Sequence, residues 1–290
     1  MGHTTDARRL KWALAMTSAF FVAEVAGGLF TNSLALLSDA GHMFSDIAAL
    51  GLSLFAFHMA RRPATAKRTY GYHRLEILAA LINGLALWLI VGAIFHEAYS
   101  RFSDPPEVQS LGMLVVALLG LAINVASGII LYGSEGQSLN LRGAFLHVIG
   151  DTLGSVGAIA AGLIMVTTGW YRADPLISVL IGLLLLYTSW DLIKESVDIL
   201  MQSVPRGIDV EEVQKAMAGV SGVIKVHDLH VWTVTSGIFT LSAHAVVNGR
   251  EDFPQLLNEI EGVLKERFHI EHTTIQLETE DREEKEFQAF

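Results

Sequence analysis

Two histidine–aspartate pairs stand out because they share one spacing and both lie inside long apolar stretches. His42 and Asp46 are four residues apart in one stretch, and His147 and Asp151 repeat this spacing in another. Residues four apart lie on the same face of a helix. Ionisable side chains are costly in hydrocarbon and by default mark the path of an ion or a proton. The pairs therefore predict a cation-binding site inside a membrane.

The side-chain types restrict the chemistry of this predicted site. The chain has no cysteine, so any metal ligands must be imidazole nitrogens or carboxylate oxygens. Two histidines and two aspartates form a four-ligand set suited to tetrahedral Zn²⁺, whereas Mg²⁺ and Ca²⁺ require more oxygens. The alternative is that each pair forms hydrogen bonds between helices. Two identical pairs in different stretches favour the metal site.

The surrounding sequence has the composition of a membrane protein. Hydrophobic residues make up 51% of the chain and charged residues 17%, and the mean hydropathy is +0.43, unlike ordinary soluble proteins. The apolar residues are concentrated in stretches long enough to cross a bilayer of about 30 Å. We predict a six-helix transmembrane bundle with helices at 10–30, 34–59, 75–99, 111–131, 143–167 and 176–200.

This arrangement lets the two pairs meet. The second and fifth helices run in opposite directions, so the two pairs approach the bilayer centre from opposite faces at about 1.5 Å per residue. Asp39 lies on the same helical stripe as His42 and Asp46. Polar residues at corresponding positions in two three-helix halves, with a ligand site near the bilayer centre, are typical of inverted-repeat transporters.

Basic residues indicate the orientation, because cytoplasmic loops accumulate Lys and Arg. With the N-terminus in the cytoplasm, the outer loops contain only Arg101 and Arg172 as basic residues. We therefore predict a transmembrane domain over 1–204 and a cytosolic domain over 205–290, with both termini cytoplasmic. Short loops and an N-terminus without a transit signal favour the inner (plasma) membrane of a bacterium. The basic segment 67–74 is typical of a contact with anionic membrane lipid.

The cytosolic part predicts an α+β domain of the ferredoxin-like kind, in αββαβ order. Its predicted elements are a helix from Asp209 to about 218, strands at 223–235 and 239–247 around a turn at Ser236 and Gly237, a helix at 252–268 and a strand at 273–277. From Arg206 onward acidic residues outnumber basic ones by 16 to 8, in a chain of net charge −10. Such a domain suits cations and argues against nucleic acid.

Two histidines flank the predicted hairpin turn. A three-residue loop would place His230 and His244 opposite each other on one face of the sheet, whereas a two-residue loop would put them on opposite faces. The alternative for each is an exposed or packed histidine without a ligand role. His227 and His269 are weaker candidates.

Over nearly its full length the chain resembles the cation diffusion facilitator family, in particular its zinc-transporting branch of bacterial zinc, cobalt and cadmium exporters and animal zinc transporters. The resemblance depends on the two pairs and on the segments RTYGYHRLEILAALING, VHDLHVW, LSAHAVV and TIQLE. It implies a homodimer with a transport site of His42, Asp46, His147 and Asp151 in each protomer. It also implies exchange of cytoplasmic Zn²⁺ for protons. Relatives with carboxylates in place of both histidines tend to transport manganese or iron, so the histidines favour zinc.

The resemblance implies further ligands outside the membrane. The matching positions make His230, His244 and Glu278 cytosolic zinc ligands, and bring His272 near His73 at the membrane end of the third helix. The chain lacks the long histidine-rich loop that many eukaryotic relatives carry between the fourth and fifth helices. Metal collection by that loop is therefore not supported.

These observations predict a proton-coupled zinc exporter rather than an enzyme. Metal binding requires neutral imidazole and ionised carboxylate, so protons and Zn²⁺ compete for the same groups, and unperturbed histidine titrates near pH ~6.5. One alternative is a zinc-dependent intramembrane enzyme, but this needs an open coordination position beside a base, and there is no His-Glu-x-x-His segment. The other alternative is a membrane metal-sensing scaffold that does not transport.

Overall fold

The computed structural model describes residues 2–60, 62–131, 139–235, 237–248 and 252–279. It divides into two compact units. Unit 1 consists of Met1–Leu52 and Ile82–Leu192, and unit 2 consists of Ser53–Leu81 and Ile193–Phe290. Unit 2 therefore combines the C-terminal part of the chain with the segment around the loop between the second and third helices.

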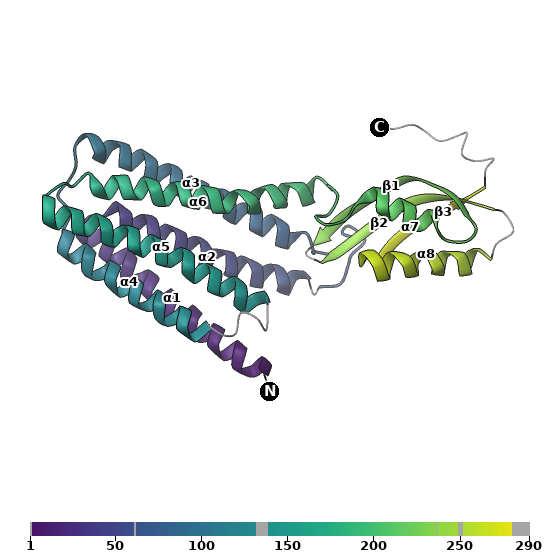
Figure 1. Ribbon diagram of the computed structural model, residues 1–290, viewed down its shortest axis with the longest axis horizontal. Coiled ribbons are helices and arrows are strands. Elements are labelled where there is room, and N and C mark those ends of the chain that lie inside the picture. Colours follow the sequence, from purple (N-terminus) through teal and green to yellow (C-terminus); the bar gives the residue numbers. More distant parts are fainter. Residues whose placement is uncertain (1, 61, 132–138, 236, 249–251, 280–290) are drawn as a thin grey trace. The chain divides into compact units, whose positions relative to one another are not determined.

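Six long helices make up the chain as far as Leu200 (Figure 1). They are α1 (Gly2–Thr31), α2 (Leu34–Ala60), α3 (Leu75–Ser103), α4 (Ser110–Leu131), α5 (Leu139–Thr168) and α6 (Ala173–Leu200). At about 1.5 Å per residue, each exceeds the ~30 Å thickness of a hydrocarbon layer. Within the described residues, four segments are both long and apolar enough to cross a membrane, and these lie in α3, α4, α5 and α6. The predicted helices are present, and the number of six crossings stays a prediction.

Buried amide side chains connect neighbouring helices of unit 1. Asn83 Nδ2 on α3 donates a hydrogen bond to Ser45 Oγ on α2 at 3.1 Å. Asn124 Nδ2 on α4 donates to Ser155 Oγ on α5 at 3.2 Å. Polar groups in apolar surroundings are stabilised by such contacts between helices. These bonds help to fix α2 and α5, the helices that carry the two histidine–aspartate pairs.

The C-terminal part of unit 2 has the expected αββαβ order. Its elements are α7 (Val210–Ala218), β1 (Val223–Thr235), β2 (Ile238–Val247), α8 (Phe253–Phe268) and β3 (His272–Glu278). Asp209 caps α7, because its Oδ1 accepts the N–H groups of Glu211 at 2.8 Å and Glu212 at 3.3 Å. The strand order is β1-β2-β3, with β1 and β2 antiparallel and β2 and β3 parallel. The parallel connection runs through α8, as parallel strands require a crossover.

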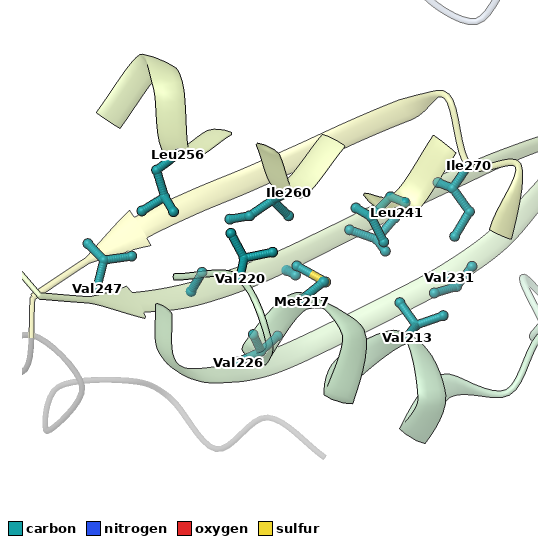
Figure 2. Close-up of a cluster of buried hydrophobic side chains, with 13 residues drawn as sticks. Val213, Met217, Val220, Val226, Val231, Leu241, Val247, Leu256, Ile260 and Ile270 are labelled. Carbon is teal, nitrogen blue, oxygen red and sulfur yellow. The ribbon is translucent and has the colours of Figure 1, made fainter. Parts of the chain in front are cut away.

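One face of this sheet packs against α7 and α8 (Figure 2). The core between them includes Val213 and Met217 of α7, Leu241 of β2, and Ile260 and Leu264 of α8, all fully buried. Successive strand residues point to opposite faces. The residues that alternate with this core therefore lie on the face of the sheet that α7 and α8 do not cover.

Candidate metal sites

The structure brings together one member of each histidine–aspartate pair. His42 Nε2 on α2 lies 3.5 Å from Asp151 Oδ1 on α5, and the Asp151 side chain is only 4% exposed. Two ligands of a tetrahedral zinc ion, each roughly 2.1 Å from the metal, are roughly 3.4 Å apart. The observed separation therefore matches that of two atoms that share one cation.

The other two members of the predicted set are not placed in the same way. Asp46 belongs to α2 and His147 to α5, but their side chains lie outside the described residues. Their part in the ligand set therefore stays a prediction.

A glycine allows α2 and α5 to approach closely beside this contact. Gly154 lies three residues after Asp151, and a Cβ atom added to it would be 2.2 Å from Asp39 Oδ1 of α2. Asp39 is buried and also hydrogen-bonds the buried Glu24 of α1. Small residues in membrane bundles permit such close helix packing. The bare backbone at Gly154 therefore helps to set the separation between His42 and Asp151.

A second group of ligand-type side chains lies on the sheet of unit 2. His227 on β1, His244 on β2 and Glu278 on β3 place one ligand atom each within 4.8 Å of one another. His227 Nε2 is 3.4 Å from Glu278 Oε2, and His244 Nδ1 is 3.4 Å from Glu278 Oε1. These separations again match the roughly 3.4 Å between two ligands of tetrahedral zinc. We name these three residues the sheet triad.

Strand alternation determines where the sheet triad lies. Ala243 and Ala245 belong to the hydrophobic core, so His244 between them points to the face that the helices do not cover. Val226 is also part of the core, which places His227 on the same uncovered face. The triad therefore lies outside the hydrophobic core, on the face of the sheet that α7 and α8 do not cover, and its Glu278 is buried.

The arrangement predicted for a three-residue loop, in which His230 lies directly opposite His244, is not found. The two strands are joined by two residues, and the register pairs His244 with His227. A bulge between His227 and His230, with Asp228 at φ of +48°, changes the alternation along β1. His230 is consequently 56% exposed and contacts Asp228 Oδ1 at 2.9 Å. His227 takes the position beside Glu278 that the family resemblance implies for His230.

His73 and His272 line one pocket of unit 2, with a volume of about 250 Å³. The ring of Tyr70 meets the ring of His272 edge-on, with a centroid separation of 5.9 Å. Among the described residues, no third ligand-type side chain completes a metal-holding group with these histidines. A metal site at His73 and His272 therefore stays a prediction.

Comparison with known families agrees with this architecture. Residues 10–201 match the cation efflux transmembrane domain, and residues 205–280 match the cytoplasmic domain of cation efflux proteins. A helical membrane domain with a histidine–aspartate contact in its interior, followed by a small α+β domain, is thus the architecture of an integral membrane cation transporter. The chain belongs to the cation efflux family, which is the cation diffusion facilitator family.

Several bacterial proteins are similar to almost the whole chain. The metal cation efflux system protein CzcD of Cupriavidus metallidurans is 47% identical over 284 residues, which cover 96% of this chain and 90% of that protein. The cadmium, cobalt and zinc/H⁺-K⁺ antiporter of Bacillus subtilis is 44% identical, covering 97% and 93%. The zinc transporter ZitB of Escherichia coli is 44% identical, covering 94% and 88%.

One solved structure resembles the C-terminal part alone. It is the metal-bound C-terminal domain of the CzcD transporter from Cupriavidus metallidurans, with 38% sequence identity and a TM-score of 0.24. The match covers 24% of this chain and 99% of that structure.

Proposed function

We propose that this protein exports Zn²⁺ from the cytoplasm in exchange for protons. The observation that supports this most is the 3.5 Å contact between His42 Nε2 and Asp151 Oδ1, which joins two helices with an imidazole and a carboxylate. In the proposal, Asp46 and His147 complete a four-ligand site. The name of one relative specifies zinc, and that of another specifies antiport of cadmium, cobalt and zinc with protons and potassium.

The same groups explain how metal and protons would exchange. Carboxylates and neutral imidazoles bind Zn²⁺, and protonation removes their capacity to do so. When the site faces the cytoplasm, Zn²⁺ binds and protons leave. When the site faces the other side, protons return and the metal is released. Each group therefore serves first as a ligand and then as a proton carrier.

The proposal includes the arrangement of the protein in the membrane. The transmembrane domain ends at about 204, both termini lie in the cytoplasm, and the membrane is the inner membrane of a bacterium. The protein is a homodimer in contact with membrane lipid. The sheet triad of His227, His244 and Glu278 holds a further Zn²⁺ ion that is not transported, because strand positions are fixed by a hydrogen-bonded ladder.

Reconstituted vesicles test the proposal directly. The full chain is incorporated with its cytosolic domain outside, the vesicle interior is made acidic, and zinc uptake is followed with an enclosed dye. A separate arm imposes a potassium gradient, because one relative's name includes potassium. We expect uptake to require the pH gradient. Zinc flux that ignores the pH gradient would remove the proton part of the proposal, and no zinc flux would favour a scaffold or an enzyme.

A matched pair of substitutions tests the site within the same assay. Asp151→Asn keeps the shape of the side chain and removes the anionic ligand, so uptake should fall by roughly 100-fold or more. Asp191→Asn makes the same change at an exposed position of α6 and should retain uptake within about twofold. Wild-type uptake by Asp151→Asn would exclude this aspartate as a ligand.

A further inference from the structure

The beginning of α2 is held by a carboxylate from another helix. We propose that this carboxylate, Asp174 of α6, is a positioning residue that sets the place of His42 against Asp151. The inference rests on the proposed role of His42 in transport. Asp174 is completely buried in the first turn of α6.

The backbone hydrogen bonds at the start of α2 are fully accounted for. The first four N–H groups of an α-helix have no partner within the helix. The Leu34 N–H donates to Asp174 Oδ2 at 2.7 Å, and the Ala35 N–H donates to Asp174 Oδ1 at 3.1 Å. Ser33 accepts the next two N–H groups, with its Oγ and its carbonyl oxygen, both at 3.3 Å. Half of the cap therefore comes from a residue about 140 positions away in the chain.

Ser33 and Asp174 also contact each other. Ser33 Oγ donates to Asp174 Oδ1 at 2.6 Å, so the carboxylate accepts three hydrogen bonds from three consecutive residues. Negative charge is favoured near helix N-termini, and Asp174 lies at two of them, that of α2 and that of its own helix. A neutral amide at this position could not accept from both backbone N–H groups through two oxygens.

The turn before α2 also forms hydrogen bonds with α3. Arg101 of α3 donates to the Asn32 carbonyl oxygen at 2.7 Å and to Asn32 Oδ1 at 3.0 Å. Asn32 has a φ of +59°, a left-handed conformation that asparagine tolerates better than most residues. The α1–α2 turn is thus fixed by α3 through Arg101 and by α6 through Asp174.

The contact between His42 and Asp151 lies a short distance along α2 from this cap. His42 follows Leu34 by eight residues, which corresponds to about 12 Å along the helix axis. Between them Ser38 and Ala40 are buried, and Asp39 rests on Gly154 of α5. A slip of α2 by one residue would move His42 by about 1.5 Å, which is enough to take its Nε2 out of ligand distance from Asp151. The cap therefore controls whether one cation can reach both side chains.

Distance measurement between α2 and α5 tests this role without depending on transport. The chain has no cysteine, so Phe44→Cys on α2 and Leu153→Cys on α5, both exposed positions, can carry spin labels in the reconstituted full chain. Asp174→Asn should broaden or shift the distance distribution between the labels. Asp191→Asn is the matched control on the same helix and should leave the distribution unchanged.

Zinc uptake supplies the second measurement. Displacement by about 1 Å can cost roughly 100-fold in a positioned site, so we expect Asp174→Asn to raise KM for zinc by at least about tenfold. Ser33→Ala removes one of three bonds to the carboxylate and should change KM and the label distance in the same direction, but by less. This milder variant gives a result even where Asp174→Asn fails to fold.

The outcomes separate the inference from the proposed function. An unchanged label distance with KM within about twofold of wild type would overturn the positioning role. A lower maximal rate and lower thermal stability, with KM and distance unchanged, would also overturn it, because Asp174 would then act only on stability. A wild-type protein that takes up no zinc would refute the proposed function, while the label distances would still decide whether Asp174 positions α2.

Discussion

The two candidate metal sites use the same donor types on different scaffolds. In unit 1, His42 and Asp151 extend from α2 and α5, and each of these helices is held to a neighbouring helix by a side-chain hydrogen bond, from Asn83 of α3 and Asn124 of α4 respectively. In unit 2, the sheet triad extends from three adjacent strands that are hydrogen-bonded to one another. The ligand separations are nearly equal, at 3.5 Å in the helices and 3.4 Å in the sheet. The difference therefore lies in what holds the ligands and not in their spacing.

This difference determines how easily each site can change shape. Moving β3 relative to β2 would break a ladder of backbone hydrogen bonds, each worth about 0.5–1.5 kcal/mol. Sliding α2 along α5 leaves the backbone hydrogen bonds inside each helix intact and changes only packing and a few polar contacts. A site between helices therefore suits binding and release of an ion, whereas a site on a sheet suits retention.

The largest expected effect is the contrast between a histidine in each site. His42→Ala removes the imidazole that contacts the buried Asp151 carboxylate, which costs about 3–5 kcal/mol, so zinc uptake into vesicles should fall by roughly 100-fold or more. His244→Ala should lower uptake by no more than about threefold, because in the proposed function the triad holds an ion that is not transported. Equal losses from the two substitutions would show that the sites do not have separate roles.

A smaller but substantial effect is expected at the glycine beside the helical site. Gly154→Ala introduces a Cβ atom that would lie 2.2 Å from Asp39 Oδ1, and such overpacking costs about 1–3 kcal/mol. We expect zinc uptake to fall by roughly 10- to 100-fold as α2 and α5 move apart. Gly92→Ala is the control, since an added Cβ there meets no atom within 4 Å. Retained uptake by Gly154→Ala would mean that the α2–α5 separation does not limit metal binding.

Most of the fold could be predicted because its signals are local. Apolar stretches of sufficient length predict all six long helices, and α2, expected at 34–59, is found at Leu34–Ala60. The start of α1 differs most, since it is expected at residue 10 and found at Gly2. The capping residue Asp209 predicts the start of α7, and the alternating pattern predicts β2, two of the elements of the αββαβ order. Each of these features depends on neighbouring residues, and so the sequence contains it directly.

The site was less predictable where its geometry depends on distant or irregular features. The hairpin spacing and the family resemblance both favour His230 over His227, because neither locates a bulge, and here the bulge at Asp228 decides which histidine meets Glu278. The core position of Val226 was the available signal for His227, because a neighbour of a core residue points to the opposite face. Asp174 gave no signal at all, since its partners are about 140 residues away.

Zinc affinity should show whether His227 or His230 belongs to the sheet triad. In an Asp151→Asn background, which removes one ligand of the proposed transport site, His227→Ala should weaken zinc binding to the full chain by at least about tenfold, because it deletes one of three proposed ligands. His230→Ala should change this affinity by less than about threefold, since its exposed ring contacts Asp228 and not Glu278. Calorimetric titration measures both variants. A larger loss from His230→Ala would restore that residue as a ligand and exclude the register seen here.

The smallest expected effect is on zinc binding by the sheet triad when a hydrogen bond at the end of β1 is removed. This change is the equivalent, in the sheet, of weakening the cap of α2. Thr235 at the end of β1 donates a hydrogen bond to Glu76 Oε2 of α3 at 2.6 Å, and Thr235→Val removes it at a cost of about 1 kcal/mol. Hydrogen exchange of amides at this end of the hairpin should rise about fivefold. Zinc affinity of the sheet triad should stay within about twofold of wild type, because the strand ladder still fixes His227 eight residues away. A tenfold loss of affinity would show that the sheet passes on small displacements as α2 does, and would remove the contrast between the two scaffolds.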